Sequence, residues 1–192
     1  MGHIVKTAPV RCPWCVGDSL YERYHDREWG RPQRSSQKLF EALILDGAQA
    51  GLSWITILRR RENYRAAFDG MDPEKIAAYT PKDVERLLLD GRIIRNRRKI
   101  ESAVTNARAY LALSEKEGSF SKWLWGFVDG EPIINRFKTM AEVPSSTELS
   151  ERISGELKRR GFSFVGPTIV YAFMQAEGLV NDHLTDCFCY GR

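Results

Sequence analysis

Residues 80–113, TPKDVERLLLDGRIIRNRRKIESAVTNARAYLAL, form the most telling stretch of this sequence. Thr80 followed by Pro81 is typical of a helix N-cap and the first helical residue, and Asn96 is a second candidate N-cap. The residues between the two helix starts include Gly91, which suits a tight turn. The stretch therefore predicts two helices joined by a short hairpin, over about residues 81–113.

The hairpin carries features that suit a nucleic-acid backbone. A tight turn that leads into a helix N-terminus offers backbone N–H groups to a phosphate, and arginine or lysine adds charge-assisted contacts. Gly91, Arg95, Arg97 and Lys99 are the candidate DNA contacts. The element resembles a helix-hairpin-helix DNA grip, although that motif usually has two glycines and this hairpin has one. The simpler alternative is a charge run on a solvated helix face.

Outward from this element, the sequence is punctuated as short helices. Helix starts and stops are indicated at Ser36, Ser53, Asp72, Ser121, Ser146, Gly161, Gly166 and Gly178. The helix that begins at Ser53 is expected to reach Phe68. Strand alternation is nearly absent, so we predict an all-α domain of eight to ten helices. A flexible N-terminus is expected over 1–11, followed by a single domain of two intertwined helical lobes over 12–192.

Composition narrows the class of protein. The 192 residues carry a net charge of +4, with basic residues in clusters that would suit a polyanion. No apolar run of membrane-spanning length occurs, and the N-terminus lacks the apolar stretch of a signal peptide. We therefore expect a cytoplasmic protein, in a reducing compartment where cysteine and histidine clusters more often bind metal than form disulfides.

Two pairs of potential metal ligands lie at opposite ends of the chain. Cys12 and His25 have the spacing C-x12-H, and His183 and Cys187 have H-x3-C, which would place both ligands on one face of a helical turn. Two thiolates and two imidazoles make a closed tetrahedral zinc site, which is structural rather than catalytic. Two alternatives remain open. One is a zinc site of the four cysteines Cys12, Cys15, Cys187 and Cys189, and the other is no metal at all, with the thiols buried or paired in disulfides.

Residues 45–54, LDGAQAGLSW, form the densest candidate for chemistry. Asp46 ends an apolar helix, where an uncompensated carboxylate is unusual. Gly51 permits a backbone conformation with positive φ, and Leu52 would stand at the tip of the loop. Gln49 and Trp54 complete the segment. The plain alternative is an ordinary turn between two helices, with Leu52 and Trp54 packed inward.

A group of aromatic residues precedes that segment. It comprises Trp14, Tyr21, Tyr24 and Trp29, with Tyr21 and Tyr24 on one helical face. Aromatic side chains more often build a core, but this group adjoins His25 and would suit gripping a flat, electron-poor ring.

Taken in order, several motifs resemble one family. They are YHD at 24–26, EWG at 28–30, QAGLSW at 49–54, RENYR at 61–65, NARAY at 106–110, KRRGF at 158–162, FMQA at 173–176 and NDH at 181–183. From about Cys12 to Tyr190, the chain is similar to bacterial constitutive 3-methyladenine DNA glycosylase I, of the helix-hairpin-helix superfamily. The resemblance implies hydrolysis of the N-glycosidic bond of 3-methyladenine in double-stranded DNA. No lysine is placed as a nucleophile in the pocket segments, so we expect a monofunctional enzyme. We also expect a monomer without an obligate protein partner, since bending duplex DNA into one pocket needs only one chain.

The resemblance also implies residue roles. One structural zinc would be held by Cys12, His25, His183 and Cys187. The base pocket falls on Trp14, Tyr21, Tyr24 and Trp54, with Asp46 and Tyr24 as the catalytic pair. Gln49, Gly51 and Leu52 would contact DNA, with Leu52 as the wedge that fills the gap in the duplex.

One departure from the family affects the expected chemistry. The family usually has glutamate where this chain has Asp46, whose side chain is one methylene shorter. A non-catalytic lesion-binding homologue therefore stays open as an alternative, as does a zinc hydrolase of another kind.

Overall fold

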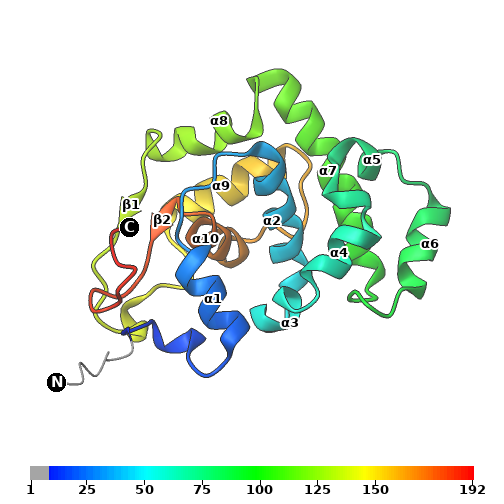
Figure 1. The fold of residues 1–192 in the computed structure, drawn as a ribbon. Helices are drawn as coiled ribbons and strands as arrows, with labels where there is room; N and C mark the ends of the chain where they lie inside the picture. Colours follow the sequence, from blue (N-terminus) through cyan, green and yellow to red (C-terminus); the bar gives the residue numbers. More distant parts are fainter. Residues whose placement is uncertain (1–8) are drawn as a thin grey trace.

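In a computed structural model, which describes residues 9–192, the chain is helical with a single pair of very short strands (Figure 1). The helices are α1 (Ser19–Arg27), α2 (Ser36–Gln49), α3 (Trp54–Leu58), α4 (Arg61–Ala67), α5 (Pro73–Ala77), α6 (Pro81–Leu89), α7 (Arg97–Glu117), α8 (Phe120–Trp125), α9 (Glu148–Arg159) and α10 (Pro167–Ala176). The strands β1 (Ile133–Ile134) and β2 (Val180–Asn181) pair in parallel. The ten α-helices within residues 9–192 agree with the predicted all-α class of eight to ten helices.

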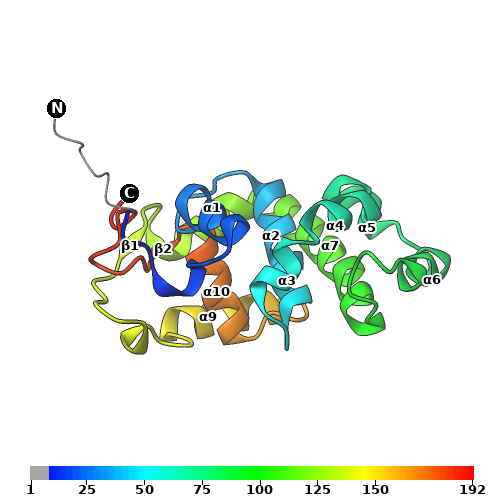
Figure 2. The same cartoon turned by 60° about the horizontal axis from the view of Figure 1, so that its bottom comes forward.

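The helices form two groups on either side of α2. Helices α4 to α7 lie on one side, and α1, α9, α10 and the strands lie on the other, in both views (Figures 1 and 2). The first described residues and the C-terminus meet at one end, where the N–H of Phe188 donates to the carbonyl of Val10. None of the described helices is long and apolar enough to cross a membrane.

The predicted two-helix element is present as α6 and α7. Thr80 and Asp83 form a capping box at the start of α6, and the Asn96 side chain accepts from the Lys99 N–H at 3.2 Å to cap α7. In the hairpin, the Arg92 side chain donates two hydrogen bonds to the Asp90 carboxylate. Helix α7 continues to Glu117, beyond the expected end near Leu113, because Gly118 with φ +84° supplies the stop.

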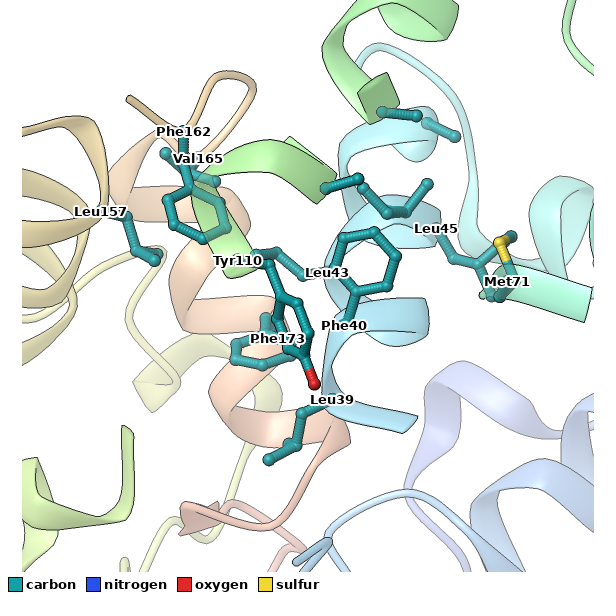
Figure 3. Packing of buried hydrophobic residues seen from close by; sticks show 14 of the residues in the cluster. Leu39, Phe40, Leu43, Leu45, Met71, Tyr110, Leu157, Phe162, Val165 and Phe173 are labelled. Carbon is teal, nitrogen blue, oxygen red and sulfur yellow. The ribbon is translucent and has the colours of Figure 1, made fainter. Parts of the chain in front are cut away.

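Apolar faces of α2, α7, α9 and α10 meet in one continuous core (Figure 3). Phe40 of α2 packs on Tyr110 of α7 with ring centroids 4.9 Å apart, and Tyr110 in turn contacts Phe120. Phe173 of α10 and Leu43 of α2 are fully buried beside them. Each such side chain contributes roughly 1.5–3 kcal/mol of burial free energy. The helix that carries Asp46 is therefore held by packing along most of its length.

Two local expectations differ from the structure. The helix predicted from Ser53 to Phe68 is divided into α3 and α4 at Arg59 and Arg60. The strands were not predicted, because two paired residues are too short to show a period of two. Elsewhere the observed N-caps Ser35, Ser119 and Thr147 lie within two residues of the predicted ones. Of the expected flexible segment 1–11, residues 1–8 lie outside the described part of the chain.

Gly178 provides a stability prediction. Its φ is +72°, and an added Cβ would lie 2.4 Å from the carbonyl carbon of Arg31 and 2.5 Å from the nitrogen of Pro32. We expect Gly178→Ala to lower the free energy of unfolding by about 3 kcal/mol or more, because left-handed strain adds to a clash with backbone. Gly118→Ala is the control, since its φ is +84° with open space around it. Equal losses in urea titrations of the two variants would contradict the assigned clash.

Candidate active site and metal centre

A cavity of about 300 Å³ opens between α1, α2 and α10. Its lining includes the five residues predicted for the base pocket, which are Trp14, Tyr21, Tyr24, Asp46 and Trp54. Gln49 and Trp29 also line it. They come from the segment before α1, from α1, from the end of α2 and from the start of α3. The fold therefore brings together side chains that are up to 40 positions apart in the sequence.

Aromatic rings make up one wall of this cavity. The side chain of Asp18 caps α1 by accepting from the Leu20 and Tyr21 N–H groups, which starts the helix so that Tyr21 and Tyr24 both reach the cavity. Tyr24 and Trp54 lie with ring centroids 5.7 Å apart and planes tilted by 47°. Trp14 meets Tyr21 edge-on at 4.8 Å. Such a wall favours a flat ring as ligand.

Asp46 faces the same cavity from the last turn of α2. It is 3% exposed, and its Oδ2 atom has no hydrogen-bond partner among residues 9–192. Burial raises the pKa of Asp46 to about 8. The Nε1 atom of Trp54 is likewise buried and unpartnered. Buried polar atoms are nearly always paired in native proteins, so these two atoms point to a ligand that supplies the missing partners.

The loop after α2 carries an exposed apolar side chain. Gly51 has φ +78° with nothing within 4 Å of an added Cβ, and Leu52 is 40% exposed. The N–H of Leu52 donates to the carbonyl of Gln49 at 2.6 Å, which closes the turn. Leu52 thus stands at the loop tip, as the sequence suggested, while Trp54 turns back toward the cavity.

Four cysteine and histidine side chains converge where the chain ends meet. One donor atom each from Cys12, His25, His183 and Cys187 lies within 4.8 Å of the others, and all four residues are buried. The two histidine nitrogens are 3.2 Å apart, and three sulfur–nitrogen pairs, Cys187 with each histidine and Cys12 with His183, are 3.4 to 3.7 Å apart. A tetrahedral zinc, with Zn–S of about 2.3 Å and Zn–N of about 2.05 Å, would set these separations near 3.3 and 3.6 Å. The cluster fits such an ion.

Hydrogen bonds select the histidine nitrogens that face the cluster. Nδ1 of His25 lies 2.9 Å from Oδ1 of Asp26, which Arg11 grips with two bonds, and Nε2 of His183 lies 3.1 Å from the Trp29 carbonyl. Each acceptor holds the proton on the outer nitrogen, which leaves the inner nitrogen unprotonated and able to bind a metal; that of His25 accepts only a long bond, 3.4 Å, from the Cys12 N–H. Burial also lowers the pKa of both histidines, for His183 to about 4, which favours the neutral ligand form.

The remaining cysteines do not join this cluster. The Sγ atom of Cys15 donates to the Cys12 carbonyl at 3.2 Å, and that of Cys189 lies near the Asp26 carbonyl. The geometry thus favours the mixed cysteine–histidine set over a site of four cysteines. One detail of the prediction is wrong: His183 and Cys187 lie in irregular turns rather than in a helical turn.

The four hairpin residues expected to contact DNA differ in their surroundings. Gly91 and Arg95 are exposed, and Arg95 has no ion pair within residues 9–192. Arg97 pairs with Glu85 at 2.7 Å. The ammonium of Lys99 donates to two backbone carbonyls of the protein itself. Of the three cations, Arg95 is thus the one whose charge faces solvent without a partner.

Sequence reasoning missed a polar network on the far side of the cavity. Asp182 is 2% exposed and accepts from the Tyr171 hydroxyl at 2.6 Å, the Gln175 amide at 2.8 Å and the Asn135 amide at 2.7 Å. Tyr171, Gln175 and Asp182 all line the cavity. Gln175 and Asp182 lie within quoted motifs, but nothing in their spacing indicated that they meet there.

Comparison with known proteins identifies relatives along nearly the whole chain. The family model for methyladenine glycosylase matches residues 14–190. DNA-3-methyladenine glycosylase 1 of Escherichia coli is 53% identical over 180 residues, which cover 94% of this chain and 96% of that protein. DNA-3-methyladenine glycosylase of Haemophilus influenzae is 51% identical, with coverages of 94% and 97%.

Solved structures agree with these relatives. A crystal structure of 3-methyladenine DNA glycosylase I superposes with a TM-score of 0.92 at 54% identity, covering 94% of this chain and all of that one. The Staphylococcus aureus enzyme, studied for its recognition of 3-methyladenine, has a TM-score of 0.91 at 39% identity, with coverages of 94% and 96%. The chain therefore belongs to the methyladenine glycosylase family.

Proposed function

We propose that this protein is a DNA-3-methyladenine glycosylase, which hydrolyses the N-glycosidic bond of 3-methyladenine in alkylated DNA and leaves an abasic site. The observation that carries the proposal is the Asp46 carboxylate, buried against an aromatic wall with one oxygen unpartnered. Membership of the methyladenine glycosylase family and relatives of that name at 51–53% identity support the activity.

The cavity suits a cationic purine. Methylation at N3 places a positive charge on adenine, so the base is already a good leaving group and little acid catalysis is required. Trp54 would stack on the ring, with a cation–π preference for the charged lesion over normal adenine, and Tyr24 would lie at the side of the ring. Asp46 would supply the opposite charge and accept a hydrogen bond from the purine edge. Trp14 and Tyr21 complete the aromatic wall.

Access to the base requires flipping it out of the duplex. This costs a few kcal/mol, and less for a damaged, poorly paired base. Leu52, exposed at the loop tip, would occupy the gap that the base leaves, and Gln49 and Gly51 would lie beside it. Gly91 and Arg95 of the hairpin would contact the phosphate backbone. Water would then attack the sugar carbon without a lysine nucleophile, so the DNA strand stays intact.

The cysteine–histidine cluster is proposed to hold one structural zinc. A bound zinc would have four protein ligands and no position for water, so it would supply cohesion rather than chemistry. Support comes from the tetrahedral spacing of the donor atoms and from the bonds that orient both histidines. A zinc hydrolase of another kind would need an open coordination position, which four protein ligands do not leave.

Base release tests the activity. Purified protein incubated with methylated duplex DNA is expected to release free 3-methyladenine well above the spontaneous rate, measured by chromatography of the liberated bases. Strand breaks should appear only after alkali treatment, because the product is an abasic site. Tight binding of lesion DNA without base release would replace the enzyme with the non-catalytic lesion-binding alternative.

A further inference from the structure

Lys99 is bonded within the protein at the point where a phosphate contact was expected. It lies in the first turn of α7, half-buried, and its Nζ donates to the carbonyl oxygens of Ala48 at 2.8 Å and Ala50 at 2.6 Å. The last carbonyls of a helix have no partner inside that helix, and a lysine ammonium is a good external one. Lys99, a residue of α7, thus caps the C-terminal end of α2.

The loop that follows α2 has few other anchors. Residues 50–53 include Gly51, with open space around it, and Leu52, which is 40% exposed. Within the described chain, every other hydrogen bond of this loop is local: Ala50 to Gly47, Leu52 to Gln49, and Ser53 to Thr56. The two bonds from Lys99 are therefore the polar tie between this loop and the hairpin helix.

The two hydrogen bonds from Lys99 join the parts of the protein that would have to act together in the proposed activity. Helix α7 begins immediately after the hairpin that offers Gly91 and Arg95 to DNA. Leu52 must enter the duplex at a fixed place relative to the phosphates that the hairpin holds. A loop without this tie would lose orientation, which costs rate even when every contacting group is present.

We infer that Lys99 is a positioning residue, which fixes the wedge loop 50–53 to the DNA-binding hairpin so that backbone binding and insertion of Leu52 occur in one geometry. This inference rests on the proposed glycosylase function. It assigns Lys99 to the loop rather than to a phosphate.

Lys99→Met tests this role, because methionine keeps length and apolar contact but donates no hydrogen bond. We expect single-turnover release of 3-methyladenine from duplex DNA to fall about tenfold or more, and release from single-stranded DNA, which needs no wedge, to fall less than twofold. Lys99→Arg should restore most of the duplex rate. Amides of residues 50–53 should exchange hydrogen faster in Lys99→Met, whether or not the protein is an enzyme, while the melting temperature stays within a few degrees.

Arg95→Met is the matched control, since it also removes one positive charge, but from the hairpin and from a side chain that faces solvent. Each phosphate contact contributes roughly 0.9 to the slope of log affinity against log salt concentration. The slope for undamaged duplex should fall by about one in Arg95→Met and stay unchanged in Lys99→Met. A fall of about one in Lys99→Met would make Lys99 a phosphate contact and overturn the inference. So would equal losses of rate on duplex and single strand, or unchanged exchange at 50–53. If wild-type protein releases no base, the proposed function fails, while the exchange and salt measurements still decide the role of Lys99.

Discussion

Asp46→Asn is expected to lower the rate of 3-methyladenine release at pH 8 by about 10- to 100-fold. The substitution keeps the shape of the side chain and removes the charge that would face the cationic base. A hydrogen bond to a charged group contributes roughly 1.5–3 kcal/mol, and each 1.36 kcal/mol in the barrier changes the rate tenfold. The measurement is single-turnover release from methylated duplex DNA, with protein in excess over lesions.

Asp46→Glu is the control, because it keeps the charge and extends the reach toward the purine edge. It should retain or raise the wild-type rate, which separates loss of charge from general disturbance of the cavity. Burial raises the pKa of Asp46 to about 8 in the free protein, so wild-type kcat/KM should increase as pH rises toward 8. A wild-type rate in both variants would remove Asp46 from base recognition.

Asp46→Asn should also raise the free energy of unfolding at high pH, relative to the wild-type protein. The folded-state pKa of Asp46, about 8, lies above the ordinary value of 3.8. Between these values the folded protein holds a proton that the unfolded chain has lost, so the free energy of unfolding falls as pH rises through that window. Asp46→Asn removes this loss, which is up to about 6 kcal/mol at pH 9. Burial also raises the pKa of Glu177 to about 8, so some slope should remain in the variant.

Loss of the proposed zinc is the second change expected to have a large effect. Cys187→Ser should yield protein without stoichiometric zinc, and its melting temperature should fall by about 10 °C or more, because buried ligands would lose the cation that joins them. Base release should fall in parallel, since His25 is a cluster residue and also meets Trp14 of the cavity wall edge-on at 5.3 Å.

Cys15→Ser provides the matched control for metal removal. Cys15 is as buried as Cys12 but lies outside the four-residue cluster, so this variant should keep one zinc per chain. Metal content by mass spectrometry and thermal melting are the two measurements. Loss of zinc in Cys15→Ser would favour the site of four cysteines instead. If wild-type protein freed of zinc melted at the same temperature as zinc-bound protein, the proposed metal centre would be wrong.

The structural features that the sequence predicted well are those that depend on a few neighbouring residues. Asp72, Thr80 and Asn96 were identified as helix caps because a cap depends on its own side chain and the next three N–H groups. The break between α3 and α4 was missed, since nothing in that stretch is a helix breaker by composition. The two-residue strands were missed because their pairing joins segments 47 positions apart.

In the candidate site too, the sequence indicated single residues but not the contacts between residues that are far apart in the chain. Residue type indicated that Asp46 and the aromatic residues were unusual, but the resemblance to a family was needed to place them in one pocket. The acceptors of Lys99 lie 51 and 49 positions before it and are backbone carbonyls, which no side-chain pattern reveals. A basic residue beside a hairpin was therefore interpreted by its charge alone.

The meeting of the chain ends at the cysteine–histidine cluster links folding to the chemistry of the surrounding solution. The proposed ligands Cys12 and His183 are 171 positions apart, so unfolding would scatter the four donors and release a bound ion. Mass action then adds roughly 1.4 kcal/mol of stability for each tenfold rise in free zinc above the dissociation constant. With zinc in this site, the free energy of unfolding would track the free zinc concentration, and zinc scarcity would reduce the folded fraction of the protein without any change in its synthesis.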